Sequence, residues 1–453
     1  MGIGNLHPMD GRYQTQKMAR LFTEDYKLSL WLKVESVLAE VHAELGNIPK
    51  DAAKEIAAKA NLEYVKLDRV KQIEDIIHHD LMAMVKALTE VCSPEAGRYI
   101  HIGATSYDIE DPALMILISQ AMDVLEESLL KTLKILVQQA EKTKHLICIG
   151  RTHGQQALPT TYGMRFSNWA SEIDRHLERI REIRKRVKVG KFSGAVGTMD
   201  AFGEQGFEIQ QKIMEKLDLK PVLIANQILQ RDRHCEVIMF TGLVAATIDK
   251  IARQMRILQR NEIGEMFEPF KETQVGSSAM PHKRNPHKAE RLCSLSRIVK
   301  ANVVVALENE TLEDERDLTN SASERIIFGE NFVLLDYMLS QLNSILQGEE
   351  FNTEAIQRNL EFTKGAIYTA AIMTKLVEKG IGRQEGHEIM RNAAIESRKT
   401  GKHLREILKT IPQIQGKLSD EELDILFNPA NNIGSAVKLV EIFIDTLKKK
   451  YNM

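Results

Sequence analysis

The sequence predicts an all-α protein built around a bundle of unusually long helices. No glycine or proline stands between Pro112 and Gly150, and apolar residues recur there in steps of three and four. This spacing places them on one face of a single helix of roughly 50 Å. Strict alternation of polar and apolar residues is scarce along the chain, so strands are expected to be minor at most. The apolar positions are Leu114, Ile118, Ala121, Leu125, Leu129, Leu133, Leu136 and Ala140.

Three more segments, 164–189, about 234–266 and 286–311, are expected to form long helices of the same kind. In the first of them, Ile173, Leu177, Ile180 and Val187 fall on one side. Helices this long exceed the usual length in a globular domain and need a partner along their whole length. Neighbouring positions are often both apolar, and such a wide stripe favours a bundle core, which we expect also to supply the interface of an oligomer.

The chain is expected to divide into three helical parts, with residues 1 to about 111 forming the first. A long-helix core follows at 112–348, and a smaller domain at 349–453. The first boundary is a helix start predicted at Asp111-Pro112, and the second lies at the polar run Gly348-Glu349-Glu350. No internal repeat or low-complexity segment is visible.

Composition and charge exclude several classes of protein. Of the 453 residues, 43% are hydrophobic and 27% charged, which is typical of a folded protein in water. The 61 basic and 63 acidic residues give a net charge of −2, which argues against a general nucleic-acid binder. The four cysteines are far apart, the N-terminus does not resemble a secretory leader, and no run approaches about 18 apolar residues. We therefore expect a cytoplasmic protein without a membrane span.

Polar junctions between the predicted helices carry the candidate chemistry. Each is richer in His, Ser, Thr, Arg or Asp than a simple turn between helices requires. A solvated connector is the alternative interpretation for any one of them. The junctions are 78–80, 103–108, 150–154, 274–286 and 315–325.

The segment GSSAMPHKRNP at 276–286 is the most informative junction. Asn285 and Pro286 are typical of the cap and the first residue of a helix, whose N-terminus carries partial positive charge. Six basic or titratable side chains nevertheless crowd this end, and only Glu290 offsets them. Without a bound anion this arrangement is unfavourable, so it predicts a carboxylate or phosphate site, an exposed basic turn being the alternative. The six residues are His282, Lys283, Arg284, His287, Lys288 and Arg291.

Residue types in two junctions suit proton transfer next to a carboxylate. Removing such a proton creates a doubly charged aci-carboxylate, which needs fixed positive charge and N–H donors, and Lys283 and Asn285 can supply them. A serine such as Ser277 acts as a base only in a strongly electropositive, desolvated loop. His153 is of the type that usually serves as a general acid near neutral pH, although a lone loop histidine is more often structural.

The eleven residues at 276–286 strongly resemble the signature loop of the fumarase/aspartase superfamily, whose members eliminate fumarate by anti β-elimination. The resemblance implies three helical domains and a homotetramer with a long-helix core. It also implies active sites assembled from three subunits. This architecture agrees with the bundle expected from the periodicity.

Within that superfamily the chain resembles the adenylosuccinate lyase family over essentially its whole length. The resemblance implies release of fumarate from adenylosuccinate, giving AMP, and from the succinyl-aminoimidazole-carboxamide ribotide, giving AICAR. The matching segments are Arg12-Tyr13, His78-His79-Asp80, Thr105-Ser106, GRTHG at 150–154, Gln227 within NQILQRDRH, and Glu315-Arg316-Asp317 followed by Ser321 and Arg325.

The resemblance implies a role for each of these residues. His153 would be the general acid and Ser277 the base that removes the β-proton. His79 would help to position the substrate phosphate or His153, and Glu290 would orient His153. Lys283 and Asn285 would hold the succinyl carboxylates. The other substrate contacts would come from Arg12, Tyr13, His78, Asp80, Thr105, Ser106, Gln227, Arg316, Ser321 and Arg325.

The chain departs from the family pattern at two places. His78 stands where arginine is usual, and residues 320–323 replace a His-Ser-Ser-type run, which leaves phosphate contacts at 78 and 322 open. Ser277 and Ser278 are adjacent, and we favour Ser277 as the base because it lies six residues before Lys283.

Several competing interpretations can be stated. Another superfamily member, such as argininosuccinate lyase or carboxymuconate cycloisomerase, is the nearest, but the first typically has glutamine at the position of His282 and the second lacks histidine at that of His153. A helical scaffold without activity is a different class. A metal enzyme using His78, His79, His101 and His153 would lack HxxxH or HExxH spacing, so we expect neither a metal nor another cofactor. The expected partners are a small-molecule nucleotide and further copies of this chain.

Overall fold

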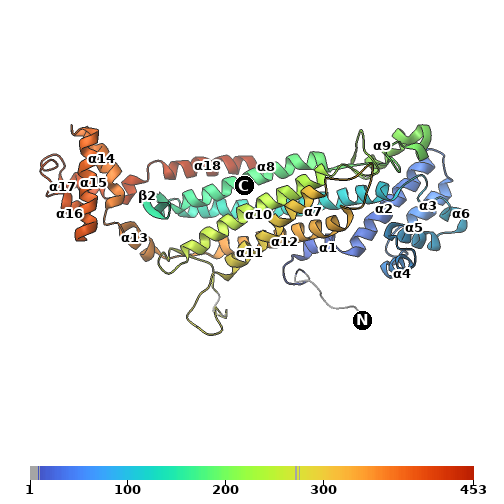
Figure 1. The fold of residues 1–453 in the computed structure, drawn as a ribbon, viewed down its shortest axis with the longest axis horizontal. Helices are drawn as coiled ribbons and strands as arrows, with labels where there is room; N and C mark the ends of the chain where they lie inside the picture. The colour runs from blue at the N-terminus through green and yellow to red at the C-terminus, as the bar shows by residue number, and fades with distance from the viewer. Residues whose placement is uncertain (1–8, 10, 271–272, 275) are drawn as a thin grey trace. The chain divides into compact units, whose positions relative to one another are not determined.

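The computed structural model describes residues 9, 11–270, 273–274 and 276–453. Most of the N-terminal segment that was compared with a secretory leader lies outside these residues. Where the chain is described, the fold is all-α, as predicted, with three short two-stranded sheets (Figure 1). In the same part of the chain, no helix has both the length and the apolar character needed to cross a membrane.

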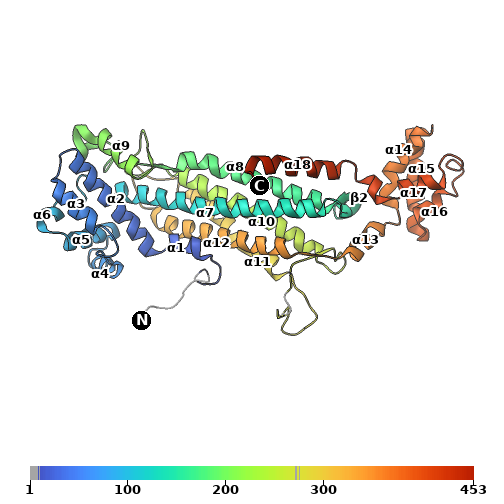
Figure 2. The same ribbon diagram turned by 180° about the vertical axis from the view of Figure 1, so that it is seen from behind.

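Two compact units share the chain, and each is assembled from three separate stretches of it. The first unit comprises Met1–Leu130, Arg175–Asp249 and Cys293–Ser340, and the second comprises Lys131–Asp174, Lys250–Leu292 and Gln341–Met453. Within each unit the long helices run alongside one another (Figure 1 and Figure 2). The domain boundaries expected at residues 111 and 348 stay a prediction. The helices that contribute to both units are α7 (Ser106–Thr143), α8 (Tyr162–Val187), α10 (Asp232–Leu258), α11 (His287–Glu308) and α12 (Ser321–Gly348).

The first unit also contains the shorter helices that precede α7. Two of them start at threonine caps, because Thr15 and Thr23 accept backbone N–H bonds in the first turns of α1 and α2. Ser128 of α7 donates a hydrogen bond of 2.6 Å to Asp336 of α12, which joins two long helices. The remaining elements of this unit are α1 (Gln16–Leu21), α2 (Glu24–Glu44), α3 (Lys50–Lys59), α4 (Leu67–Ile77), α5 (Asp80–Val91), α6 (Pro94–Gly97), β3 (Val189–Gly190), η1 (Asp200–Gln205), α9 (Gly206–Lys216) and β4 (Lys220–Pro221).

The second unit combines two sheets with the helices of the C-terminal third of the chain. Strands β1 and β2 form an antiparallel hairpin, and β5 pairs antiparallel with β6. The elements are β1 (Ile147–Thr152), β2 (Gln155–Thr161), β5 (Met266–Phe267), β6 (Glu350–Phe351), α13 (Thr353–Glu361), η2 (Ala366–Tyr368), α14 (Thr369–Glu378), α15 (Arg383–Thr400), α16 (Leu404–Leu408), α17 (Asp420–Leu426), η3 (Pro429–Asn432) and α18 (Ala436–Tyr451).

Helix α7 confirms the longest predicted helix but begins earlier than expected. Its buried side includes Leu125, Leu129 and Leu133, as the spacing predicts. The start predicted at Pro112 is wrong, since the helix begins at Ser106. The side chain of Asp108 accepts the backbone N–H of Thr105 at 2.9 Å, a capping contact that lets the helix start six residues ahead of the proline. Pro112 therefore lies inside the helix, where it removes one backbone hydrogen bond and its ring crowds the carbonyl of Asp108.

The other long helices match their predicted ranges to different degrees. Helices α8 and α11 lie within three residues of the predicted ends. Helix α10 stops at Leu258, short of the predicted end near 266, because the chain turns there and enters strand β5.

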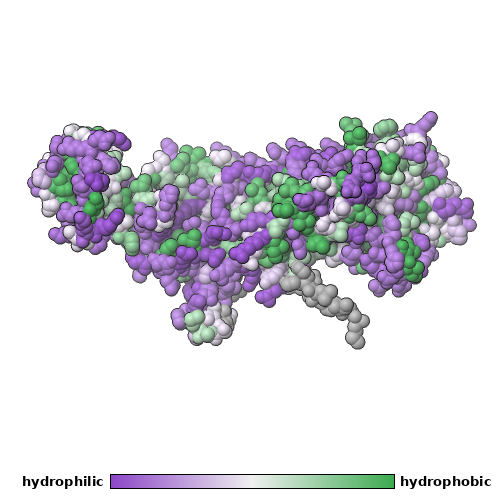
Figure 3. Space-filling model, in the orientation of Figure 1, coloured by the Kyte–Doolittle hydropathy of each residue, from purple (hydrophilic) through white to green (hydrophobic). Residues whose placement is uncertain are grey.

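Apolar side chains remain exposed on two long helices of the first unit. Met239 and Leu243 of α10 and Ile298, Val304 and Leu307 of α11 keep between 44% and 62% of their surface exposed. The face drawn in Figure 3 is mostly polar and is interrupted by apolar patches. Extended apolar surface on a folded protein is typical of an interface with another chain.

Candidate active site

The GRTHG motif lies at the tip of a β-hairpin. The sequence analysis placed it in a junction between two helices, and that expectation is wrong, because strands β1 and β2 flank it. Thr152 of β1 faces Gln155 of β2, so His153 and Gly154 form a two-residue turn. Both have positive φ, 55° and 74°, which a type I′ hairpin turn requires. The fold therefore presents the side chain of His153 on an exposed turn.

Glu265 holds this hairpin through Arg151, near the turn, and Tyr162, just after β2, and its side chain is completely buried in the second unit. One carboxylate oxygen lies 2.5 Å from Arg151 Nη2 and accepts a bond of 2.8 Å from the amide of Asn359. The other accepts the hydroxyl of Tyr162 at 2.8 Å and lies 3.5 Å from Arg165. Burial alone would raise the pKa of Glu265, but the hydrogen bonds and charges of these neighbours outweigh it and hold the pKa below its ordinary value.

The signature loop at 276–286 closes on itself within the second unit. The amide nitrogen of Asn285 donates to the carbonyl of Gly276 at 2.9 Å, and a Cβ on Gly276 would lie 2.0 Å from the carbonyl oxygen of Lys283. Position 276 therefore requires glycine. The side chain of Lys283 is exposed. The Oγ atom of Ser277 accepts the backbone N–H groups of Ala279 and Met280 at 3.4 and 3.1 Å.

The N-terminus of α11 already has an anionic partner, which corrects the sequence analysis. Glu268 is almost fully buried, and its two carboxylate oxygens accept the backbone N–H groups of Lys288 and Ala289, each at 3.2 Å. Glu290 is therefore not the only acidic group at this helix end. Since these two donors are occupied, a substrate carboxylate must rely on the side chains of the loop. The predicted cap at Asn285 is also displaced, since the helix begins at His287.

His79 and Asp80 lie at the start of α5 in the first unit, close to the start of α7. The Nδ1 atom of His79 accepts the N–H of Met82 at 3.3 Å, which in a neutral ring leaves the proton on Nε2. That atom lies 3.4 Å from Ser106 Oγ. Arg325 Nη2 lies 2.8 Å from Asp80 Oδ2 and 3.7 Å from Glu110 Oε2. The fold thus brings together several residues that the sequence predicted for one site.

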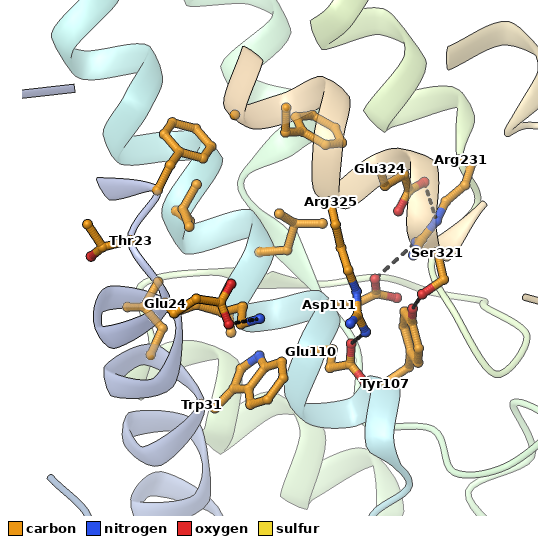
Figure 4. A pocket seen from close by; sticks show the side chains of 18 residues that line it. Thr23, Glu24, Trp31, Tyr107, Glu110, Asp111, Arg231, Ser321, Glu324 and Arg325 are labelled. Carbon is orange, nitrogen blue, oxygen red and sulfur yellow. Dashed lines mark hydrogen bonds and ion pairs between the residues drawn. The ribbon is translucent and has the colours of Figure 1, made fainter. Parts of the chain in front are cut away.

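A cavity of about 140 Å³ opens beside this group, and Tyr107, Glu110, Ser321 and Arg325 line it (Figure 4). The side chain of Arg325 points toward Glu110, and the hydroxyl of Tyr107 points toward Ser321. Burial, together with the nearby Asp80 carboxylate, raises the pKa of Glu110 to about 8, although Arg325 acts in the opposite direction. Charged groups of both signs thus border a partly apolar cavity.

The remaining predicted contacts of the first unit lie on several elements. The Arg12 guanidinium lies 5.4 Å from the ring of Tyr13, which packs on Tyr337. Gln227 donates to the carbonyl of Ala195 at 2.9 Å. His78 ends α4 with a positive φ of 54° and an exposed side chain.

The predicted residues fall into two sets that belong to different units. His153, Ser277, Lys283, Asn285 and Glu290 lie in the second unit, and the other predicted residues lie in the first. Among the described residues, no hydrogen bond or ion pair joins His153 to Glu290 or to the signature loop. In the same ranges, no three His, Cys, Asp or Glu side chains are grouped so that they could hold a metal ion.

Comparison with known proteins supports the resemblance seen in the sequence. A lyase family model matches residues 11–300, and a model of the adenylosuccinate lyase C-terminus matches residues 365–443. The adenylosuccinate lyase of Methanocaldococcus jannaschii is 48% identical over 446 residues, which cover 98% of this chain and 96% of that one. The enzyme of Pyrococcus abyssi is 49% identical over 444 residues, 98% of each chain. The chain belongs to the adenylosuccinate lyase family.

Solved structures of related enzymes share the fold of this member of the family. The 3-carboxy-cis,cis-muconate lactonizing enzyme of Pseudomonas putida is 31% identical, with a TM-score of 0.89 over 96% of this chain and 98% of that one. A fumarate lyase of Mesorhizobium sp. BNC1 is 30% identical, with a TM-score of 0.89 over 96% and 99%. The protein is thus an enzyme of the lyase family with the all-α fold of these relatives.

Three residues around the candidate site of this adenylosuccinate lyase family member were missed by the sequence analysis. Tyr107, Glu110 and Glu265 were not predicted as site residues, although Tyr107 stands in the 103–108 junction, and each contacts partners far away in the chain. The only signal for the first two was their place beside the Thr105-Ser106 pair. Glu265 gave none.

Proposed function

We propose that this enzyme releases fumarate from adenylosuccinate, giving AMP, and from the succinyl-aminoimidazole-carboxamide ribotide, giving AICAR. The observation that carries the proposal is that one chain presents both an exposed hairpin histidine, His153, and a basic loop that holds Ser277 and Lys283. The identity to adenylosuccinate lyases along nearly the whole chain supports the same reaction.

In the proposed reaction the base is Ser277, and it removes the β-proton of the succinyl group. Its Oγ already accepts two backbone N–H groups, which would stabilise negative charge on that oxygen. Lys283 and Asn285 hold the succinyl carboxylates, and the charge of Lys283 offsets that of the aci-carboxylate intermediate.

The elimination is completed when the C–N bond breaks. The electron pair left at carbon by proton removal forms the C=C bond of fumarate, and the bonding pair of C–N goes to the leaving nitrogen. His153 protonates that nitrogen as the general acid. Glu290 is proposed to orient His153.

The first unit is proposed to hold the nucleotide. Arg12, Tyr13, Arg316, Ser321 and Arg325 would contact the phosphate. The further contacts would come from His78, His79, Asp80, Thr105, Ser106 and Gln227.

The active enzyme is proposed to be a homotetramer in the cytoplasm, with each site completed by residues of several subunits. The exposed apolar side chains of α10 and α11 support an interface between copies of the chain. The absence of a contact between His153 and Glu290 within one described chain is consistent with sites that are shared between subunits.

Fumarate release from adenylosuccinate by the purified protein tests the proposal. Argininosuccinate serves as the control, and 3-carboxymuconate tests a cycloisomerase, the alternative raised by the similarity to the lactonizing enzyme. We expect fumarate from adenylosuccinate and from the ribotide only. Turnover of one of the two control substrates in their place would contradict the substrate assignment.

A further inference from the structure

Three arginines lie around Tyr107 in the first unit, and they differ in whether a carboxylate neutralises their charge. Arg231 is buried and lies 2.9 Å from Asp111 and 3.1 Å from Glu324. Arg316, by contrast, has no ion pair with a carboxylate among the described residues. Arg231 is therefore neutralised within the fold, and the charge of Arg316 is not.

Arg325 is the third of these arginines and, like Arg231, it is paired with carboxylates. Its guanidinium lies 2.8 Å from Asp80 and 3.7 Å from Glu110. Arg316 is thus the one of the three that has no carboxylate at ion-pair distance among the described residues, so its charge is the least neutralised.

The orientation of Arg316 comes from neutral groups. Its Nη1 atom donates to the side-chain oxygen of Asn320 at 2.9 Å, and its guanidinium carbon lies 4.0 Å from the centre of the Tyr107 ring. Its Nη2 atom is buried and has no hydrogen-bond partner. A buried donor without a partner is costly, and an anion would satisfy it.

The hydroxyl of Tyr107 contacts Ser321, a second residue of the proposed phosphate site. Its hydroxyl donates to Ser321 Oγ in a long hydrogen bond of 3.4 Å, visible in Figure 4. The Tyr107 side chain is 9% exposed, and the Arg231 guanidinium lies 5.7 Å from the ring. The ring is therefore held in place from several sides.

We propose that Tyr107 is the positioning residue of the phosphate subsite, because its ring supports Arg316 and its hydroxyl sets Ser321. This inference rests on the proposed function, in which Arg316 and Ser321 hold the nucleotide phosphate. A carboxylate in place of the ring would hold the guanidinium more strongly but would cancel the charge that the phosphate needs. An aromatic face attracts the cation and leaves its charge unchanged.

The test is the affinity for AMP relative to adenosine, measured by calorimetry on the full-length protein. The variants are Tyr107→Phe, which keeps the ring, and Tyr107→Leu, which removes it. The matched control is Tyr26→Phe, since Tyr26 also donates a side-chain hydrogen bond, to Gln120 at 2.6 Å, and has no place in the proposed site.

We expect the preference for AMP over adenosine to fall about tenfold in Tyr107→Leu and at most about threefold in Tyr107→Phe. Adenosine binding should stay unchanged in both variants, which shows that they are folded. In the background of Arg316→Met, adding Tyr107→Leu should lower AMP affinity no more than Tyr107→Phe does alone, because the ring acts through the arginine and only the contact of the hydroxyl with Ser321 remains to be lost. The Tyr26→Phe control should match the wild type.

Equal loss of AMP and adenosine binding, or an unchanged preference in Tyr107→Leu, would overturn the inference. A wild-type protein with no preference for AMP would do the same. Measuring turnover distinguishes a failure of this inference from a failure of the proposed function. In an active enzyme Tyr107→Leu should raise KM about tenfold with kcat nearly unchanged. A protein that prefers AMP but releases no fumarate would refute the proposed reaction and leave the phosphate subsite standing.

Discussion

The β1–β2 hairpin and the signature loop both belong to the second unit, but they differ in whether their basic side chains form ion pairs within the fold. Arg151 of the hairpin and Arg165 of α8 share the buried carboxylate of Glu265. In the loop, Lys283 is exposed, and the bonds that hold the loop are made largely by its own residues, as between Asn285 and Gly276.

The difference shows that basic residues orient the turn of His153 in one place and are available to bind the substrate in another. The charge of Arg151, neutralised inside the fold beside the turn, fixes the strand that leads to His153, so that the turn has a defined direction. The charge of Lys283, which has no ion pair among the described residues, is available to a carboxylate of the substrate, whereas Arg284 of the same loop pairs with Glu350. The sequence alone shows basic residues in both places and does not separate the two uses.

The largest expected effect tests the loop as the source of the base. Ser277→Ala should lower kcat at least about a thousandfold, because the hydroxyl acts in proton removal rather than in ground-state binding. AMP affinity should be unchanged. The matched control, Ser278→Ala, should keep most of the activity. If Ser278→Ala is the inactive variant, the base must be reassigned.

A somewhat smaller loss is expected when the hairpin loses its acid. His153→Ala should lower kcat by about a hundredfold or more, measured by fumarate release at neutral pH. His145→Ala, another exposed histidine of the second unit, should leave kcat unchanged. Near-native turnover by His153→Ala would remove this residue from the mechanism.

Removing the charge of Glu265 should destabilise the β1–β2 hairpin and leave the signature loop unchanged. Glu265→Gln leaves Arg151 and Arg165 without their shared counter-charge, which should lower the free energy of unfolding by about 3 kcal/mol. The measurement is thermal unfolding at fixed protein concentration. An unchanged melting temperature would show that the hairpin does not depend on this carboxylate.

A tight contact in the loop should affect activity more than stability. Gly276→Ala places a Cβ against the Lys283 carbonyl, so the loop must shift, and we expect kcat to fall about tenfold. Melting should change little, because the loop makes few contacts outside itself. Gly386→Ala in α15 is the control, since its Cβ meets no atom closer than 3.7 Å. Equal kcat in the two variants would contradict the prediction.

The last prediction concerns a buried carboxyl that has no basic partner at ion-pair distance among the described residues. Burial raises the pKa of Glu349 to about 8 from an ordinary value of 4.5. Between these pH values the unfolded chain has lost the proton and the folded chain keeps it. Stability therefore falls as the pH rises from about 4.5 to about 8, by at most about 1.4 kcal/mol per unit, and then levels off.

Glu349→Gln should remove this dependence. The difference in melting temperature between the variant and the wild type should grow between about pH 5 and pH 8 and stay constant above. A difference that is the same at every pH would show that Glu349 does not titrate in this way.

The fold could largely be predicted because apolar periodicity is a local signal. The spacing of Leu125, Leu129 and Leu133 fixes the buried side of α7 before any partner is known. The start of that helix was missed because a proline looked like a first residue, whereas the contact between Asp108 and the N–H of Thr105 sets it.

The candidate site could be predicted only where the residues form a recognisable motif. The GRTHG and GSSAMPHKRNP segments pointed to His153 and Ser277 directly. The partners of Glu265 lie 94 to 114 residues away along the chain, and no local pattern predicts such a contact. The hairpin was missed for a related reason, since its turn is His-Gly rather than the usual Asn-Gly or Asp-Gly.

The interleaving of the chain between the two units has a consequence for synthesis. The first unit ends at Ser340 and the second begins at Lys131. A chain growing from its N-terminus therefore exposes the apolar stripe of α7 long before α12 has been made. Neither unit can complete its core on the ribosome until most of the protein has emerged, so the nascent chain depends on protection from aggregation during translation.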